Sequence, residues 1–371
     1  MFLKQLSAIN FKSYSQIEVE FHSKLNCFIG NNGQGKTNLL DTIYYLSMCK
    51  SAFNPIDSQN IKHGEDFFIV QGQYNRDQKE ENIFCAVKLN EGKAFKRNGK
   101  EYQRLADHVG LLPLVIVSPA DLALIIEGSE ERRRYINSVI SQFDKLYLDE
   151  LIRYNRVLAQ RNKLLKDFAD KNSFSDDLIE VLDIQLEQLG NVIFTKRKQF
   201  VEKLIPIFQK YYSIVSGDSE TVKLEYQSQL EDASYSELLK NSISKDRAIQ
   251  YTSVGIHKDD LILMLGDHLI KKDGSQGQQK TYLIALKLAQ FEFIKNISGI
   301  RPILLLDDIF DKLDLNRVES FIKLVSDNGF GQIFITDTNK SRLDEILEKL
   351  HSGYKVFKVE YGNIEIVVQK D

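Results

Sequence analysis

The sequence has few cysteines and no long apolar segment. Its three cysteines, Cys27, Cys49 and Cys85, are odd in number and lack the spacing of a metal or redox motif. They therefore fit isolated buried thiols in a reducing compartment. No run approaches the roughly 18 apolar residues of a membrane helix, and Lys4 interrupts the apolar stretch at the start of the chain. We expect a cytoplasmic protein with neither a transmembrane helix nor a signal peptide.

The chain also lacks an excess of positive charge, since its net charge is −3 at pH 7. This balance argues against a uniformly basic nucleic-acid coat, so any DNA contact must come from local patches. With 371 residues, of which 43% are hydrophobic, the chain can bury a large core. It is long enough for two or three domains, or for one large domain with an insertion.

What is present is a glycine-rich motif: residues 30–37 read GNNGQGKT and match G-x-x-x-x-G-K-[ST]. A strand-like run at 25–29 precedes it and a helix-like run at 38–46 follows, which is the context that a phosphate-binding loop needs. Backbone N–H groups and the positive end of the helix are expected to bind a polyphosphate. The residues expected to contact it are Gly30, Asn31, Asn32, Gly33, Gln34, Gly35, Lys36 and Thr37.

Two residues of this motif have specific roles in phosphoryl transfer. Lys36 is expected to neutralise the β and γ phosphates as a catalytic residue, and the Thr37 hydroxyl to ligate Mg²⁺. The four fixed positions arise by accident on the order of once per hundred chains of this length. The alternative interpretation, a glycine turn in another α/β domain, is therefore disfavoured.

A second cluster of chemistry follows an apolar run at 303–306, which ends in Asp307 and Asp308. A buried parallel strand that delivers an acid at its carboxyl end is what a P-loop fold uses to hold Mg²⁺, so Asp307 is the expected metal residue. Asp308 is placed to polarise the attacking water. Alone, the pattern is equally typical of a helix cap, but together with the glycine-rich motif it predicts catalysis.

A third motif, Gly274 to Lys280, precedes a helix that we expect to be amphipathic. Ser275 is a good N-cap, and a simply capped helix is one interpretation. The other is a second anion-binding helix terminus, at which Ser275, Gly277 and Gln278 meet a γ-phosphate.

Changes of pattern along the chain indicate three segments. Residues 1–117 contain strands, three of them before residue 30, and the glycine-rich loop; residues 118–250 have long, charged helical patterns with a polar break at 170–176; residues 251–371 return to α/β alternation. We expect an α/β core, built from both ends of the chain as a β layer plus a parallel sheet with helices, and a mostly helical insertion.

These motifs resemble those of known ATPases. Ser275 to Gln278 resembles the S-G-G-Q signature of ABC-type ATPases, and residues 311–314 resemble their D-loop. In that family the signature of one protomer closes on the nucleotide held by the other. The resemblance implies ATP and Mg²⁺ as cofactors, a composite site and an ATP-dependent homodimer.

The similarity extends over most of the chain to the RecF family of bacterial recombinational repair. It is carried by residues 11–14, 118–122, 131–135, 252–261, the signature and 304–308. The resemblance implies an ATP-dependent DNA-binding protein that binds duplex DNA and single-strand gap junctions. It also implies work with RecO-like and RecR mediators to load RecA, and a weak, DNA-stimulated ATPase without a membrane partner.

Several residues depart from the family pattern. Lys12 and Lys258 stand where Arg is usual, and Lys loses bidentate phosphate geometry. Asp308 is one methylene shorter than the usual Glu of ABC ATPases, and Thr336 to Thr338 stand where a switch His is expected. Both differences predict slow hydrolysis, with the nucleotide as a timer.

Two questions stay open at this point. The basic residues that could meet DNA phosphates equally fit a solvated helix face balanced by acids; they are Arg132, Arg133, Arg134, Arg153, Arg156 and Arg161. His257 is either a nucleotide sensor or an ordinary turn histidine. An alternative function is a chromosome-structural ATPase of the SMC or Rad50 kind, against which the short helical insertion argues.

Overall fold

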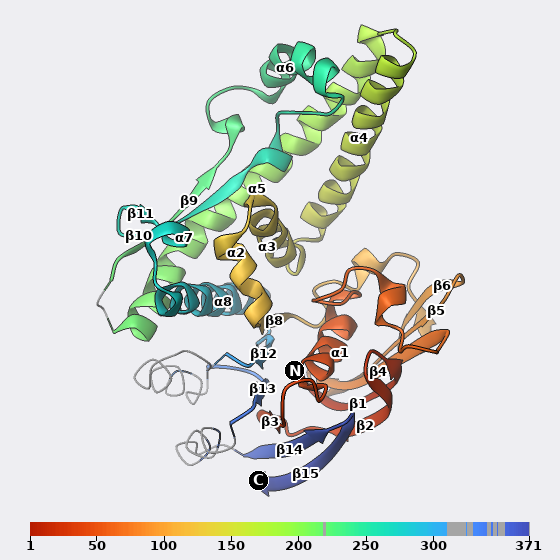
Figure 1. Ribbon diagram of the computed structural model, residues 1–371, viewed down its shortest axis with the longest axis vertical. Helices are drawn as coiled ribbons and strands as arrows, with labels where there is room; N and C mark the ends of the chain where they lie inside the picture. The colour runs from red at the N-terminus through yellow and green to blue at the C-terminus, as the bar shows by residue number, and fades with distance from the viewer. Residues whose placement is uncertain are drawn as a thin grey trace. The chain divides into compact units, whose positions relative to one another are not determined.

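The computed structural model describes residues 1–217, 220–309, 324, 329–339, 343, 347 and 353–370. The chain folds into two compact units (Figure 1). The first contains residues 1–122, 211–219 and 275–371, and the second contains residues 123–210 and 220–274. Both ends of the chain thus contribute to the first unit.

One sheet of the first unit is antiparallel and has six strands in the order β2-β1-β4-β5-β6-β7. Asn98 and Gly99, which join β6 to β7, have φ values of 51° and 78°, the two positive values that a type I′ Asn-Gly turn requires. The strands are β1 (Phe2–Phe11), β2 (Tyr14–Glu20), β4 (Phe67–Arg76), β5 (Lys79–Lys88), β6 (Gly92–Arg97) and β7 (Lys100–Glu101).

The second sheet also has six strands, in the order β15-β14-β3-β13-β12-β8. All neighbours are parallel except β15, which runs antiparallel to β14. The strand before the glycine-rich loop therefore belongs to this sheet and does not continue the antiparallel one. The strands are β3 (Leu25–Ile29), β8 (Leu114–Val117), β12 (Ile303–Asp307), β13 (Ile333–Asp337), β14 (Tyr354–Glu360) and β15 (Asn363–Lys370).

Aromatic side chains join the two sheets of the first unit into one core. Phe28 of β3 stacks on Phe357 of β14 with 4.9 Å between ring centroids, and Phe21, which follows β2, meets Phe334 of β13 edge-on at 5.0 Å. Such pairs stabilise a core beyond the area that they bury. Helix α1 (Lys36–Met48) adds Leu39, Ile43 and Leu46 to the same cluster.

Helix α8 (Gln276–Ser298) is buried along most of its length. Every residue from 281 to 291 is buried, so the expectation of an amphipathic helix was wrong. Lys287 is buried as well, with only 6% of its surface exposed, and it forms an ion pair with Asp121 at 2.5 Å. The described part of the first unit also contains short 3₁₀ helices at Asp57–Asn60, Leu105–Asp107 and Pro119–Leu122.

The second unit is a helical assembly with a small sheet. Its long helices α4 (Lys145–Asp170) and α5 (Asp176–Ser216) meet at the predicted polar break. Residues 171–175 join the two helices directly, and a linker of this length is too short to contain the hinge of an SMC protein. The other elements are α2 (Ala123–Ile126), α3 (Ser129–Ser141), α6 (Tyr235–Ile249), α7 (Ile270–Asp273) and 3₁₀ turns at Gln229–Glu231 and Ile256–Lys258.

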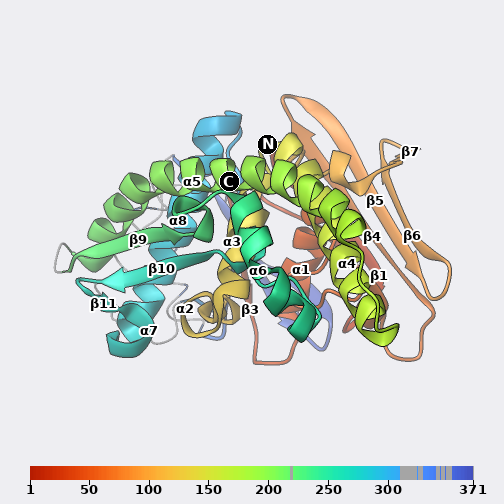
Figure 2. The ribbon, with the colours of Figure 1, turned by 90° about the horizontal axis from the view of Figure 1, so that it is seen from above.

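The sheet of the second unit changes the expected domain limits. Strand β10 (Asp260–Leu265) pairs antiparallel with β9 (Val222–Gln227) and with β11 (His268–Leu269). Figures 1 and 2 show β9 beside α5, where the rings of Tyr226 and Phe194 are 6.1 Å apart. Residues 251–274 therefore belong to the second unit because their strand pairs there, whereas the sequence pattern placed them with the ATPase core.

Candidate nucleotide-binding site

The glycine-rich loop joins the carboxyl end of β3 to the amino end of α1. Gly33 and Gly35 have φ values of 80° and 110°, a region that side chains with a Cβ rarely adopt. At Gly30 a Cβ would lie 2.3 Å from the carbonyl oxygen of Val359, and at Gly35 it would lie 3.0 Å from the Tyr14 hydroxyl. The loop geometry thus requires glycine at each of these positions.

The Lys36 side chain contacts the first residues of the loop. Its ammonium group donates to the carbonyl oxygens of Gly30 at 2.6 Å and Asn31 at 2.9 Å. Burial lowers the pKa of Lys36, and the carboxylates of Asp307 and Asp308 act in the opposite sense. Since α1 has no side-chain cap and no acid in its first turn, its positive end is open to an anion.

Asp307 meets Thr37 at the carboxyl edge of the parallel sheet. The Thr37 hydroxyl donates to Asp307 Oδ2 at 2.8 Å, and the Thr336 hydroxyl donates to Oδ1 at 2.7 Å. Burial raises the pKa of Asp307, and the two hydroxyl hydrogen bonds oppose that effect. A hydroxyl and a carboxylate side by side are ligands that Mg²⁺ prefers, so these residues fit the metal assigned to them.

Asp308 follows directly and lies in the left-handed region with φ 47°. Its N–H donates to the Thr336 hydroxyl at 3.0 Å. A non-glycine residue in this region costs roughly 1–3 kcal/mol, and such strain is concentrated at functional sites. Asp308, the expected catalytic carboxylate, is half-buried, follows Asp307 and lies within electrostatic reach of Lys36.

Ser275 is the N-cap of α8, as predicted. Its hydroxyl accepts from the N–H of Gln278 at 3.2 Å, and the Gln278 side chain accepts from the N–H of Ser275 at 2.7 Å, forming a capping box. Ser275 is exposed, and Gly277 and Gln278 are half-exposed. The D-loop residues 311–314 lie outside the described residues.

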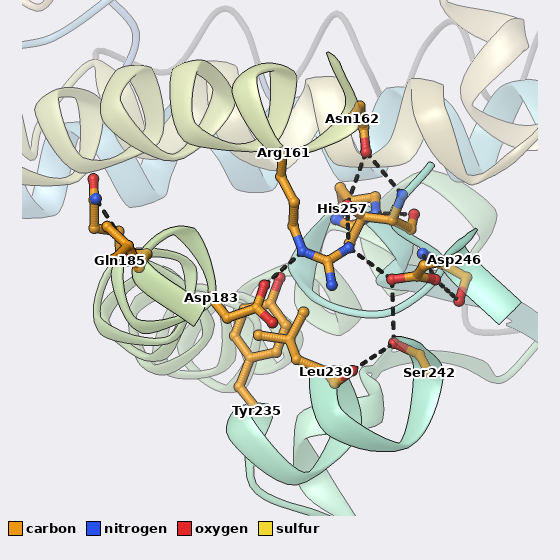
Figure 3. Close-up of polar contacts among 12 residues, drawn as sticks. Arg161, Asn162, Asp183, Gln185, Tyr235, Leu239, Ser242, Asp246 and His257 are labelled. Carbon is orange, nitrogen blue, oxygen red and sulfur yellow. Dashed lines mark hydrogen bonds and ion pairs between the residues drawn. The ribbon is translucent and has the colours of Figure 1, made fainter. Parts of the chain in front are cut away.

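Two arginines expected at DNA are buried in the second unit, and that expectation is corrected. Arg161 is fully buried and forms ion pairs with Asp183 at 2.5 Å and Asp246 at 2.7 Å (Figure 3). Burial lowers the pKa of Arg161, but these ion pairs raise it above its usual range. Arg132 is 8% exposed, and its guanidinium binds both carboxylate oxygens of Asp260 at 2.6 and 2.9 Å.

The other four arginines differ in exposure. Arg133 is half-buried and donates to the carbonyl oxygen of Asp259 at 2.7 Å. Arg134, Arg153 and Arg156 are exposed; Arg134 forms surface pairs with Glu130 at 2.6 Å and Glu131 at 2.5 Å, and Arg153 forms one with Glu150 at 3.0 Å. Exposed pairs of this kind are weak, so these guanidinium groups are available to a phosphate.

His257 packs as a structural residue of the second unit. Its Nδ1 lies 2.8 Å from the Tyr154 hydroxyl and its Nε2 lies 3.0 Å from the carbonyl oxygen of Thr252. Burial lowers the pKa of His257 to about 4, so the ring is neutral near pH 7. These contacts favour the turn-histidine interpretation.

The roles of two residues at the site were not predicted from the sequence. Thr336 supports Asp307 from the neighbouring strand β13, and Tyr14 donates its hydroxyl to the carbonyl oxygen of Gly35 at 2.9 Å. Thr336 is the next-to-last residue of the strand β13, and a threonine at such a place is too common to be an informative signal. Tyr14 lies in a segment that carried the family resemblance, although its role followed only from the fold.

A P-loop strand and an acidic strand lie in one parallel sheet, separated by β13, beside an antiparallel β layer and a capped helix. This arrangement defines an ABC-type P-loop ATPase fold with a head of the SMC kind. The family model described as RecF/RecN/SMC N terminal domain matches residues 2–365. The chain belongs to the RecF family, as its relatives show.

The DNA replication and repair protein RecF of Bacteroides fragilis (strain YCH46) is 55% identical over 372 residues, 100% of both chains. The protein of the same name from Flavobacterium johnsoniae is 50% identical over 359 residues, 97% of this chain and 100% of that one. A solved structure of the recombination mediator protein RecF with ATP has a TM-score of 0.89 at 31% identity, covering 99% and 98% of the two chains. An Smc head structure, with a TM-score of 0.57 at 15% identity, shares the fold alone.

Proposed function

We propose that this chain is an ATP-dependent DNA-binding protein of recombinational repair that dimerises on ATP. The observation that carries the proposal is the convergence of Lys36, Thr37 and Asp307 at one edge of the parallel sheet. A solved relative in the same family is described as a recombination mediator with ATP. This pairing of site and relative supports ATP as the nucleotide.

The loop residues bind the triphosphate through backbone N–H groups, and Lys36 exchanges its two carbonyl contacts for phosphate oxygens. Thr37 and Asp307 are the residues that hold Mg²⁺, which when bound neutralises charge between the β and γ phosphates. Asp308 then orients and polarises the attacking water. Because its side chain is short, and because Thr338 follows β13 where a switch histidine is usual, hydrolysis is weak.

The site is completed by a second copy of the chain. Ser275, Gly277 and Gln278 present the amino end of α8 to solvent, so Ser275 of the partner subunit can reach the γ-phosphate. ATP thereby holds the two protomers together. Hydrolysis then releases the two protomers from each other, so the nucleotide sets how long the dimer lasts.

DNA is the proposed substrate of the dimer, as duplex and at single-strand gap junctions. The exposed guanidinium groups of Arg134, Arg153 and Arg156 are the phosphate contacts proposed here. Contacts of this kind carry little sequence preference. RecO-like and RecR mediators are the proposed protein partners, since solved relatives are named for the RecFOR pathway. Among the described residues, no helix combines the length and hydrophobicity needed to cross a bilayer.

Mass measurement by light scattering tests the composite site. Wild-type protein with Mg²⁺ and ATP is expected to shift from monomer to dimer, whereas Ser275→Arg stays monomeric but still binds ATP. The arginine adds bulk and charge at an exposed helix end without touching the loop that holds the nucleotide. An ATP-dependent dimer in the Ser275→Arg variant would contradict the proposal.

A further inference from the structure

We propose that the turn between β14 and β15 is part of the phosphate-binding site, and that Gln34 is the positioning residue that connects it to the loop. This inference rests on the proposed binding of ATP. The turn consists of Tyr361 and Gly362, which follow Glu360 at the end of β14 and precede Asn363 at the start of β15.

Two hydrogen bonds join the turn to the loop across a sequence separation of 327 residues. The N–H of Tyr361 donates to the side-chain oxygen of Gln34 at 2.5 Å, and the N–H of Gly362 donates to the main-chain oxygen of Gln34 at 3.4 Å. Strand β14 also touches the start of the loop, because Val359 occupies the space that a Cβ on Gly30 would need.

The loop is also contacted by Ser13, in the turn between β1 and β2, and by Tyr14 at the start of β2. The Tyr14 hydroxyl donates to the carbonyl oxygen of Gly35 at 2.9 Å, and Ser13 accepts from the Asn38 side chain at 2.8 Å. The two turns also approach each other, since a Cβ on Gly362 would lie 3.5 Å from the carbonyl oxygen of Ser13. Gln34 and Gly35 are therefore held by contacts from two neighbouring segments, the β14–β15 turn and the start of β2.

The hydrogen bonds accepted by the loop carbonyl groups determine which way the loop N–H groups point. In a trans peptide the C=O and the following N–H are antiparallel. The carbonyl oxygen of Gln34 accepts from the Gly362 N–H, and that of Gly35 accepts from the Tyr14 hydroxyl and from the N–H of Leu39 in α1 at 3.0 Å, so the N–H groups of Gly35 and Lys36 face the other way. Those are N–H groups that a phosphate loop offers to its anion, so the turns preorganise the site.

The turn itself has a fixed conformation. Tyr361 and Gly362 have φ values of 49° and 82°, the pair of positive values of a two-residue type I′ hairpin. The left-handed region is uncommon for a bulky residue, and the side chain of Tyr361 is 85% exposed. Packing therefore does not explain the position of this tyrosine, whereas its backbone N–H has a defined partner in the loop.

The test replaces Gln34 by methionine, which keeps the length of the side chain and removes the acceptor oxygen. Gln34→Met is expected to bind ATP and ADP roughly three- to tenfold more weakly than wild type. The 30–37 peptide should also exchange its amide hydrogens faster without nucleotide. Gln103→Met makes the same chemical change at an exposed position outside the site, and it should alter neither quantity.

A second variant addresses the turn. Gly362→Ala strains a residue with positive φ, and it is expected to raise amide exchange in the same loop peptide. If loop exchange in both variants equals that of wild type, the inference is overturned, whether or not ATP binds. Failure of wild-type protein to bind ATP would instead remove the proposed function, so the two failures can be told apart.

Discussion

The Thr37 hydroxyl donates to Asp307 Oδ2 at 2.8 Å, although 270 residues separate the two in the chain. Strand β13 lies between β3 and β12 in the sheet and contributes Thr336, which donates to the other oxygen of the same carboxylate. Thr37 and Asp307, the residues proposed to hold Mg²⁺, are thus brought together by a sheet order that joins both ends of the chain. Chemistry at this edge depends on the whole first unit.

Replacing Lys36 by alanine should weaken ATP binding by roughly 100-fold, the range expected when charge-assisted hydrogen bonds to phosphate are lost. Isothermal titration calorimetry measures the change. Lys24→Ala removes the same charge from an exposed position of the first unit, and its affinity should match that of wild type. Equal affinities in the two variants would mean that the loop does not bind the triphosphate.

Asp308→Asn should slow ATP turnover by roughly 100-fold or more, because the amide cannot accept a proton from water. ATP affinity should change little, since the metal and loop contacts remain. Single-turnover kinetics with excess enzyme separates the two effects. Normal turnover in this variant would assign the role of base to another residue.

Arg161→Met should lower the free energy of unfolding by about 3–5 kcal/mol, since it leaves the buried Asp246 without its guanidinium partner. Arg153→Met, on the exposed face of the same helix, should change it by less than about 1 kcal/mol. Urea denaturation of both variants measures the difference. Similar stabilities would contradict the burial of Arg161.

Protonation of His257 should destabilise the fold at acid pH. Its pKa is about 4 in the folded chain, against about 6.5 in an unfolded one, so the unfolded state binds more protons between these values. The contribution of this histidine is complete above about pH 6.5 and is lost as pH falls toward 4, in total roughly 2–3 kcal/mol.

Urea denaturation from pH 4.5 to 7 tests this slope. His257→Asn lacks the titrating group, so its free energy of unfolding should depend less on pH over the same range. An identical slope in wild type and variant would show that other groups cause the loss of stability.

Local pattern was sufficient to predict the loop, strand and helix end that carry the expected site residues. The loop at 30–37, the acidic strand and the Ser275 cap each occupy a few consecutive residues, and the side chains in them follow from strand and helix periodicity. The long helices could be predicted in the same way, because the polar break at 171–175 lies between two periodic segments.

Contacts between segments far apart in the chain could not be predicted from local sequence pattern. Arg161 and Arg132 were assigned to DNA because their partners, Asp246 and Asp260, lie 85 and 128 residues away. A charged residue on a helical pattern looks exposed until the segment that covers it is known. Strand β9 was missed for the same reason, since its pairing partner begins only at Asp260.

Fluorescence anisotropy of duplex and gapped DNA tests the central claim most directly, with ATP, with ADP and with the Ser275→Arg variant at two salt concentrations. The account predicts binding that needs both ATP and an intact Ser275, weakens with salt and weakens further in the double variant Arg153→Met, Arg156→Met. Binding that is indifferent to nucleotide, or no binding at all, would contradict an ATP-gated DNA-binding protein.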